Sequence, residues 1–523
     1  MSYMEKLNEY REGNRLEAKL AAGGLPDSLW ATYSAFANTD GGVILLGVAE
    51  NDDKSLSFTG LKKNPEDLLV DFWSTINNKN KVNVNILFDR NVQIAEVDGR
   101  KIIVIEVPRA ERSDKPVFLN EKPFAETYRR NGEGDFRCSE KLVKAMLRDG
   151  SDSTQDMHTL NEMSFNVFNF ESVQGFRNRM RHTRPGHVWE ELENIQFLHK
   201  LGAVGRGESD ELHPTAAGLL MFGFEYEIMR EYPEYFLDYQ ESYDATKTWT
   251  DRFCSSDGEW SGNVYDFFFK TYNKIILNPK IKIPFKMEGI YRVDDTHIHK
   301  AIREALVNCL SNADYYGERG LIVRNKSDEL VFENPGGFRI SLDEAKSGGT
   351  SAPRNSVILK MFNLLDIGER TGSGIPRITE SWREEFSIVP KYTVQYNPDR
   401  AILTMQLPNM ESGTVNEESG TVNEESGTVN EESGTVNDAN GTVNEESGTV
   451  NEESGTVNEE SGTLNTAQIL RLLSESPNAT YDDIVKSLGL KKRTVAREIK
   501  MLRDNGNIKR VGSDKTGYWE VIE

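Results

Sequence analysis

The chain has 523 residues, a formal net charge of −22 and three cysteines. This length is too great for a single hydrophobic core, so several domains are expected. The cysteines Cys138, Cys254 and Cys309 lie far apart, which excludes a disulfide framework and a C-x-x-C metal site and fits a reducing cytoplasm. The charged N-terminus and the shortness of apolar runs such as "GGVILLGVA" argue against a signal peptide and a membrane span. We therefore expect a cytoplasmic protein without a membrane partner.

The charge is distributed unevenly along the chain. Residues 411–464 contain 14 acidic and no basic residues, whereas residues 465–523 contain 11 basic and 8 acidic residues. The net charge of the whole chain therefore does not describe the partners of each part.

The first 150 residues read as a strand, a helix, a buried apolar strand, an acidic loop, a further strand, a hairpin and a final helix. Three motifs occur in this order: "LEAK" after a charged start, "AFANTDGG" leading into "GV", and "YRRNG" before the last helix. Together they resemble the AlbA-type domain of the Schlafen family. The resemblance implies a nucleic-acid-associated fold and, in some members, a metal-dependent ribonuclease.

Ribonuclease chemistry of this type needs carboxylates that converge on one or two divalent ions. Glu12 and Glu17 match the spacing of the paired family glutamates, and Lys19 would stabilise charge on the scissile phosphate. The third acid should follow the "GV" strand, where the candidates are Glu50, Asp52 and Asp53. In the alternative interpretation, Glu17 and Lys19 alternate on an exposed strand edge, and "AENDD" is a polar turn.

Residues 151–290 resemble the connector that follows the AlbA-type domain in many bacterial proteins, and no chemistry is predicted there. The next segment, "HIHKAIREALVNCLSNADYYG", is an amphipathic helix on which Glu304, Asn308 and Asn312 share one face. Polar side chains are costly to bury without partners. We therefore expect a ligand at this face.

Two glycine-rich motifs follow this helix, "VFENPGGF" and "GERTGSGIPRI". With the helix, they resemble the GHKL-type ATP-binding fold in its RecG C-terminal-like version, over residues 291–410. The resemblance implies ATP and magnesium, with manganese as the alternative metal; Glu304 would position water and Asn308 would hold the metal. The other residues expected at the nucleotide are Asn312, Asn334, Gly336, Gly337, Gly372 and Gly374.

Glycines permit close approach of the backbone to phosphates, and the helix after Gly374 would offer its N-terminal amides to them. The family's adenine-recognising aspartate has no clear equivalent in "ENPGG", where Asn334 stands nearby. The sequence therefore does not identify which nucleotide base the site would recognise. The alternative to ATP binding is a degenerate fold that only scaffolds or dimerises the chain. Separately, we expect the protein to form a homo-oligomer.

Residues 411–464 repeat the unit "GTVNEES". A coiled coil needs two apolar positions in every seven, but this unit offers one valine and a glycine that costs about 1 kcal/mol in a helix. An odd period also places successive valines of a strand on opposite faces. We predict an extended acidic tether, with a solenoid of short strands as the alternative.

Residues 465–523 read as three short helices and a hairpin. This order resembles the winged helix-turn-helix domains of bacterial regulators. The third helix would enter a major groove with basic and polar residues in its first turns, namely Lys491, Lys492, Arg493, Thr494 and Arg497. The alternative is a winged helix that contacts only protein.

The sequence thus predicts a multidomain α+β protein with four parts: an AlbA-type Schlafen domain, an α/β GHKL-like domain, an acidic repeat tether and a winged helix. Its predicted function is that of a nucleic-acid-binding, nucleotide-responsive protein of transcription regulation or phage defence, with DNA as the expected partner and RNA as the second. The alternative function is a metal-dependent ribonuclease of Schlafen type. Both ATPase and nuclease activity stay open.

Overall fold

The computed structural model describes residues 15–132, 134–243, 248–278, 280–281, 286–288, 291–293, 296–368 and 372–408, and parts of residues 469–521. The chain divides into two compact units, Met1–Glu417 and Glu418–Glu523. Several predicted features lie outside the described residues: Glu12, the repeat at 411–464, and Lys491, Lys492, Arg493, Thr494 and Arg497.

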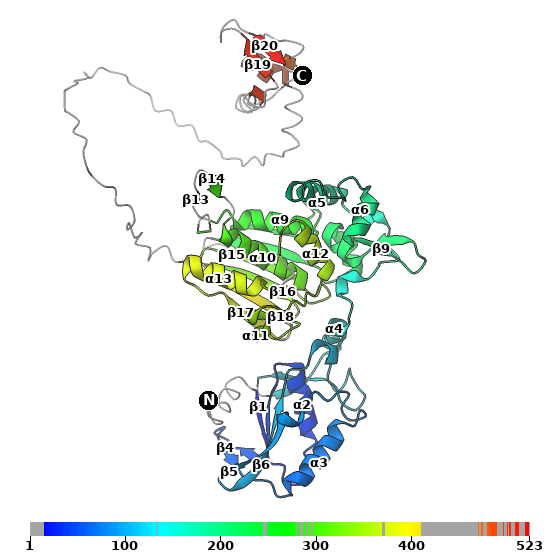
Figure 1. Cartoon of the computed structure of the whole chain (residues 1–523), viewed down its shortest axis with the longest axis vertical. Helices are drawn as coiled ribbons and strands as arrows, with labels where there is room; N and C mark the ends of the chain where they lie inside the picture. The colour runs from blue at the N-terminus through cyan, green and yellow to red at the C-terminus, as the bar shows by residue number, and fades with distance from the viewer. Residues whose placement is uncertain are drawn as a thin grey trace, which may run out of the picture. The chain divides into compact units, whose positions relative to one another are not determined.

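A four-stranded sheet forms the centre of the N-terminal domain, residues 15–150, in the order β1-β2-β6-β5. Strand β1 runs parallel to β2, and the other neighbours are antiparallel. The domain also has two hairpins, β3–β4 and β7–β8. The strand bounds are β1 Leu16–Lys19, β2 Gly42–Leu46, β3 Val48–Glu50, β4 Leu56–Phe58, β5 Val92–Val97, β6 Arg100–Val107, β7 Tyr128–Asn131 and β8 Gly134–Arg137 (Figure 1).

Strand β2, "GVILL", is buried along its whole length. Because side chains alternate in a strand, Ile44 and Leu46 enter the hydrophobic cluster under the helices, while Val43 and Leu45 enter a second cluster on the other face. A strand covered on both faces is uniformly apolar, as this one is. Three helices complete the domain: α2 Ser28–Asn38, α3 Pro65–Ile76 and α4 Glu140–Gly150.

The sequence prediction for this domain omitted α3, and the predicted acidic loop belongs to the β3–β4 hairpin. Helix α3 has Pro65 at its first position, an acidic first turn and buried Leu68, Phe72 and Ile76. The proline and the acidic first turn are typical of a helix start, and the spacing of the apolar residues is typical of an amphipathic helix. The sequence therefore contained the signals for α3.

A six-stranded sheet forms the centre of the following region, residues 151–408, in the order β12-β11-β15-β16-β18-β17. Only β11 and β15 are parallel neighbours. The bounds are β11 Leu237–Ser242, β12 Asp251–Cys254, β15 Leu321–Lys326, β16 Glu329–Pro335, β17 Lys391–Gln395 and β18 Arg400–Gln406; the smaller strands are β9 Val204–Arg206, β10 Leu212–Pro214, β13 Lys286–Glu288 and β14 Tyr291–Val293.

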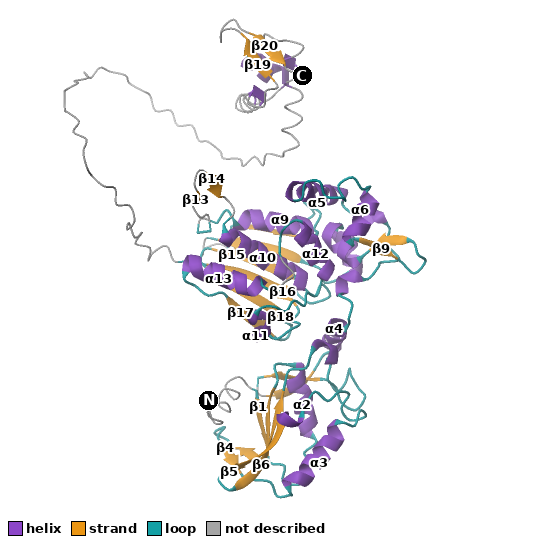
Figure 2. Cartoon of the chain, in the orientation of Figure 1, coloured by secondary structure: helices purple, strands orange, loops and turns teal. Residues whose placement is uncertain are grey.

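Helices pack on this sheet, with α10 lying against β16 and between α9, α12 and α13 (Figure 2). The helices of the region are α5 Phe170–Thr183, α6 Asn194–Leu201, α7 Ala216–Phe222, α8 Glu225–Glu231, α9 Val264–Ile275, α10 His297–Asn312, α11 Leu342–Ser347, α12 Ser356–Leu364 and α13 Gly374–Phe386. No helix in the described ranges combines the length and the apolar composition that a membrane crossing requires.

One hydrophobic core extends from Leu160 to Leu407. Strands β11 and β12 of the expected connector belong to the same sheet as β15–β18. The boundary expected at residue 290 therefore falls inside one sheet and one core. Sequence reasoning placed it there because the motifs of the nucleotide-binding region begin only after that point.

The C-terminal unit contains helix α15 Tyr481–Leu488 and an antiparallel hairpin of β19 Ile508–Val511 and β20 Tyr518–Val521. Buried side chains from along the unit share one cluster, including Ile469, Ile484, Val495, Ile508 and Trp519. The described helix and hairpin occur at the positions expected from the sequence. The winged-helix assignment stays a prediction.

Candidate functional site

Helix α10 carries a row of polar side chains along one face. Glu304 is only 4% exposed, and the amide of Asn308 donates a hydrogen bond of 3.2 Å to its Oε1 atom. Asn312 donates to the backbone carbonyl of Asn308 at 2.9 Å. The helix begins after Thr296, whose side chain forms a capping box with His299. Because α10 packs against β16 and α13, this polar row faces the interior of the domain.

The N-terminus of α13 lies directly against this polar row. The helix begins at Gly374, and a Cβ atom on that residue would overlap the carboxylate of Glu304 and lie 2.8 Å from the amide nitrogen of Asn308. Gly372 has φ of +72°, and a Cβ atom there would lie 2.5 Å from the carbonyl oxygen of Thr350. Both positions therefore require glycine, as close backbone approach does.

A cavity of about 130 Å³ lies between α10, α13 and the sheet. Of the eight residues predicted for the nucleotide, seven line it: Glu304, Asn308, Asn312, Asn334, Gly337, Gly372 and Gly374. Its other walls include apolar side chains such as Leu359, Ile378 and Leu403. A concave apolar site with a few convergent polar groups is the usual form of a small-molecule site. We name it the α10 pocket.

Gly336 is the eighth predicted residue, and it lines a different cavity. Its φ is +85°, and a Cβ atom there would lie 2.8 Å from the guanidinium of Arg354. The role of Gly336 in the structure is thus to let a buried arginine approach the backbone.

The residue types of the α10 pocket fit a nucleotide with a metal ion, because an acid, three amides and glycine backbone converge over apolar side chains. The volume does not yet fit, because nucleotide-sized sites measure about 300–1,000 Å³. Gly374 lies against Glu304 and Asn308, and Gly372 and Gly374 both line the cavity. A nucleotide would fit there only if the start of α13 moved away from α10.

Of the predicted acids of the N-terminal domain, the described residue Glu17 is engaged with cations. Glu17 on the edge strand β1 forms ion pairs of 3.1 Å with both Lys19 and Arg130, and Arg130 also contacts Asp135 at 3.0 Å. Glu50 is exposed at the end of β3, and Asp52 and Asp53 are exposed in the turn that follows. Within the described ranges, no group of three His, Cys, Asp or Glu side chains is arranged to hold a metal ion. The metal site predicted with Glu12 stays a prediction.

The "AFANTDGG" motif positions the hairpin β7–β8. The amide of Asn38 donates to the carbonyls of Val117 and Tyr128, and the hydroxyl of Thr39 accepts from the backbone amide of Arg130. Gly41 has φ of +73°, and a Cβ atom there would lie 2.6 Å from the carbonyl oxygen of Val107. The motif is therefore structural in this domain, and it fixes the strand that carries Arg129 and Arg130.

Those two arginines point to opposite sides, as neighbours in a strand do. Arg130 pairs with Glu17 and Asp135 inside the N-terminal domain. Arg129 reaches the following region, where its Nη1 atom donates to both oxygens of Asp399 at 2.6 and 2.8 Å. The motif "YRRNG" did not predict a contact for Arg129; its alternation with Arg130 on a strand was the available signal.

A second contact between the two regions centres on Arg354, which is 2% exposed. Its Nε and Nη2 atoms donate to the two oxygens of Asp149, each at 2.8 Å. Burial raises the pKa of Asp149, but the charge and hydrogen bonds of Arg354 outweigh it and hold that pKa below its ordinary value. No sequence motif marked this pair, because its partners lie 205 residues apart.

Three family models match parts of the chain. Residues 12–139 match "Schlafen, AlbA_2", residues 319–403 match "Putative ATP-dependent DNA helicase recG C-terminal", and residues 144–238 match a domain of unknown function, DUF8451. The RecG-type match begins after α10, so the polar row of that helix is outside it. A search of curated proteins finds no match.

Two solved structures are similar to the chain. One is the crystal structure of the DIP2311 protein from Corynebacterium diphtheriae, with 13% identity and a TM-score of 0.37, covering 99% of this chain and 100% of that one. The other is the N-terminal domain of a putative ATP-dependent DNA helicase RecG-related protein from Nitrosomonas europaea, with 33% identity and a TM-score of 0.20, covering 26% of this chain and 89% of that one. These low TM-scores do not establish a shared fold. The family matches place a Schlafen AlbA_2 domain and a RecG C-terminal-like domain in one multidomain α+β chain.

Proposed function

We propose that the protein is a nucleic-acid-binding regulator whose state depends on a nucleotide bound in the α10 pocket. The observation that carries the proposal is the convergence of Glu304, Asn308 and Asn312 with the glycines of two loops in one cavity. This cavity lies in a chain that also contains a Schlafen AlbA_2 domain. The two domain types together fit a nucleic-acid-related regulatory protein.

The chemistry of the pocket supports a nucleoside triphosphate with magnesium. Magnesium prefers oxygen ligands and is usually shared between a protein side chain and phosphates. Asn308 would offer its amide oxygen to the metal, and Glu304 would orient water near the terminal phosphate. The first amides of α13 would face the phosphates once the segment at Gly372–Gly374 has moved.

Nucleic-acid binding is proposed for the C-terminal unit and the AlbA_2 domain. Residues 465–523 of this unit carry 11 basic and 8 acidic residues, and basic clusters supply most of the affinity for phosphate backbones. Arg493 and Arg497 are the residues we propose to contact DNA, with Lys491, Lys492 and Thr494 beside them. RNA is the alternative partner.

Calorimetry with the full chain tests the nucleotide part of this proposal. ATP with magnesium should bind the wild-type protein, and Asn308→Ala should weaken binding at least tenfold, because it removes the metal ligand. Asn178→Ala is the matched control, because Asn178 is an exposed residue of α5. If no nucleoside triphosphate binds, or if Asn308→Ala binds ATP as tightly as the wild type, the α10 pocket is not a nucleotide site.

A further inference from the structure

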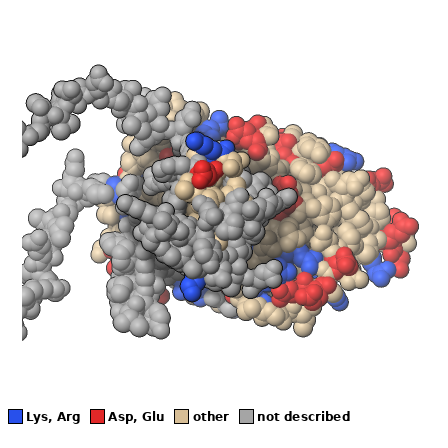
Figure 3. All heavy atoms as spheres, turned by 90° about the horizontal axis from the view of Figure 1, so that it is seen from above, with Lys and Arg blue, Asp and Glu red and all other residues tan. Residues whose placement is uncertain are grey.

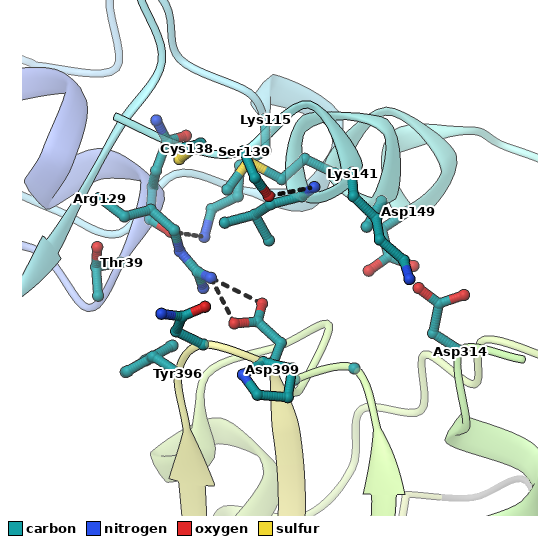
Figure 4. A pocket seen from close by; sticks show the side chains of 18 of the residues that line it. Thr39, Lys115, Arg129, Cys138, Ser139, Lys141, Asp149, Asp314, Tyr396 and Asp399 are labelled. Atoms are coloured by element: carbon teal, nitrogen blue, oxygen red, sulfur yellow. Dashed lines mark hydrogen bonds and ion pairs between the residues drawn. The ribbon is translucent and has the colours of Figure 1, made fainter. Parts of the chain in front are cut away.

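A cavity of about 410 Å³ lies between the N-terminal domain and the region that follows it. Its lining comes from the hairpin β7–β8 and helix α4 on one side, and from the β17–β18 turn and the loop after β16 on the other (Figure 4). Nine lysines and arginines line it, against four aspartates and glutamates. We name it the basic cavity.

The carboxylates of this cavity do not balance its cations. Asp399 is taken by Arg129, Asp314 by Arg148 at 3.1 Å, and Glu318 by Lys141 at 3.2 Å. The remaining basic side chains include Lys115, whose amino group donates to the backbone carbonyl of Asn38 at 3.2 Å. Within the described residues, Lys115 has no carboxylate within ion-pair distance.

The surroundings of Lys115 are unfavourable to its charge. Burial, followed by the nearby charges of Arg109 and Arg129, lowers the pKa of Lys115 well below its ordinary value. The opposing charges of Asp40 and Asp399 do not offset this. Figure 4 shows the Lys115 amino group beside the guanidinium of Arg129, facing the same cavity. An anion placed there would remove this repulsion.

Unused hydrogen-bond donors mark the same walls. Among the described residues, the buried Nε atoms of Arg129, Arg148 and Arg339 have no hydrogen-bond partner, and all three side chains line the basic cavity. The Arg339 side chain is only 6% exposed. Buried donors without acceptors are costly. A ligand rich in acceptor oxygens would satisfy them after small rotations of these side chains.

The cavity differs in charge from the rest of the chain before residue 465. On the face seen in Figure 3, basic and acidic side chains of the described residues are interspersed, and the residues of the N-terminal unit and the repeat together are acidic. A basic interior in an acidic protein is therefore a specific feature rather than a consequence of composition.

We propose that the basic cavity binds the phosphate of a nucleotide, either a free nucleotide or the phosphorylated end of a nucleic-acid strand. Arginine and lysine side chains recognise phosphate oxygens by charge-assisted hydrogen bonds. The cavity volume of about 410 Å³ is within the range of nucleotide-sized sites. Phe136 lines it and is 57% exposed, so its ring offers a surface on which a base can stack. The site is distinct from the α10 pocket, although Gly337, Phe338 and Arg339 line both.

Calorimetry with the full chain, without divalent metal, tests this proposal. The probes are adenosine 5′-monophosphate and a 5′-phosphorylated trinucleotide, each beside its unphosphorylated form. The phosphorylated probes should bind and the unphosphorylated ones should not. Lys115→Met should weaken binding by about tenfold or more, as expected for a lost charge-assisted hydrogen bond, and Lys115→Arg should retain most of it.

Two further variants make the test specific. Lys62→Met removes an exposed lysine of the same domain outside the cavity and should leave the affinity unchanged. Arg137→Gln removes an exposed arginine at the cavity wall, leaves the buried network intact and should weaken binding. Tighter binding of the trinucleotide identifies a strand end as the ligand, and tighter binding of the mononucleotide identifies a free nucleotide. The proposal is overturned if no phosphorylated probe binds, or if Lys115→Met and Arg137→Gln both bind as the wild type does.

Discussion

Arg354 is a buried cation, and the carboxylate that compensates its charge is that of Asp149. Its guanidinium is held by Asp149, by backbone carbonyls of Asn312 and Gly337, and by close packing against Gly336. A buried ion pair adds little net stability, but removing one partner leaves an uncompensated charge and costs about 3–5 kcal/mol. The contact between the N-terminal domain, residues 15–150, and the following region is therefore sensitive to substitution of Arg354 or of its partner Asp149.

Asp149→Asn should lower the free energy of unfolding by about 3 kcal/mol at neutral pH. The folded-state pKa of Asp149 lies below its ordinary value, so its stabilising contribution is complete above the ordinary aspartate pKa and is lost as the pH falls through the folded-state pKa. Denaturant unfolding of the wild type and the variant at several pH values measures this difference in the free energy of unfolding. The difference between wild type and variant should therefore narrow in acid.

The exposed residue Asp52 provides the matched control. Asp52→Asn should change the free energy of unfolding by less than about 0.5 kcal/mol. An Asp149→Asn variant as stable as wild type at neutral pH would show that the pair with Arg354 does not hold the two regions together.

Substitution of Glu17 distinguishes a nucleic-acid-binding role of the AlbA_2 domain from a nuclease role. Its carboxylate already lies between the cations of Lys19 and Arg130, and Arg130 keeps Asp135 as a partner if Glu17 is lost. We expect Glu17→Gln to leave the affinity for nucleic acid unchanged. We also expect the wild type and the variant to show the same absence of metal-dependent cleavage. Incubation of both proteins with RNA and DNA and with magnesium or manganese checks this. Metal-dependent cleavage by the wild type alone would instead establish the ribonuclease alternative.

At the scale of elements, the segment from Gly372 into α13 forms one wall of the α10 pocket. In the described conformation it lies against Glu304 and Asn308 and leaves a cavity smaller than a nucleotide needs. A closed and an open arrangement of this segment would differ in nucleotide affinity, and a ligand shifts such an equilibrium only by its differential affinity.

Gly374→Ala should destabilise the closed arrangement, because its Cβ atom would overlap the carboxylate of Glu304. We expect the free variant to lose about 1–3 kcal/mol of stability, as overpacked sites do, and to gain a larger increase in Tm from ATP and magnesium than the wild type gains. Thermal unfolding with and without nucleotide measures both effects. Gly23→Ala is the control, because a Cβ atom there meets nothing within 4 Å. A smaller nucleotide effect in Gly374→Ala would show that the closed segment belongs to the bound state.

The sequence predicted the α10 pocket better than the basic cavity. Glu304, Asn308 and Asn312 are spaced by helical turns, so their common face could be read directly, and the glycine motifs marked the loops opposite. The basic cavity has no such local pattern. Its walls are built from Lys115, Arg129, Arg339 and Asp399, which only the packing of two regions brings together.

The fold shows the same distinction between local and long-range information. The apolar strand β2 and the helix α10 follow from periodicity alone. The membership of β11 and β12 in the sheet of β15–β18 depends on a parallel pairing of β11 with β15, more than 80 residues apart. A single sequence contains no local signal for that pairing.

At the scale of the whole molecule, the loop after β16 connects the two cavities. Gly337, Phe338 and Arg339 line both the α10 pocket and the basic cavity. The AlbA_2 domain contacts this loop directly, because Arg109 donates to the carbonyl of Phe338 at 2.6 Å. The helix α4 that follows it also makes a contact, since Arg339 donates to the carbonyl of Asp149 at 2.9 Å. A nucleotide that moves this loop would therefore change contacts made by the AlbA_2 domain.

Such a connection is a coupling free energy, and it must act in both directions. If nucleotide binding changes the affinity for nucleic acid by a given factor, nucleic acid changes the affinity for nucleotide by the same factor. Couplings of this kind typically correspond to about 5–150-fold changes in affinity. The proposal of a nucleotide-responsive regulator depends on this coupling between nucleotide binding and nucleic-acid binding.

The most direct test is the nucleic-acid affinity of the full chain, measured by fluorescence anisotropy at fixed salt with and without ATP and magnesium. We predict that nucleotide changes the Kd of the wild type by at least about fivefold. We also predict that Asn308→Ala, which lacks the proposed metal ligand, shows no such change, while Asn178→Ala behaves as the wild type does. Equal nucleic-acid affinity of the wild type with and without nucleotide, at concentrations where calorimetry shows the nucleotide to be bound, would contradict the claim.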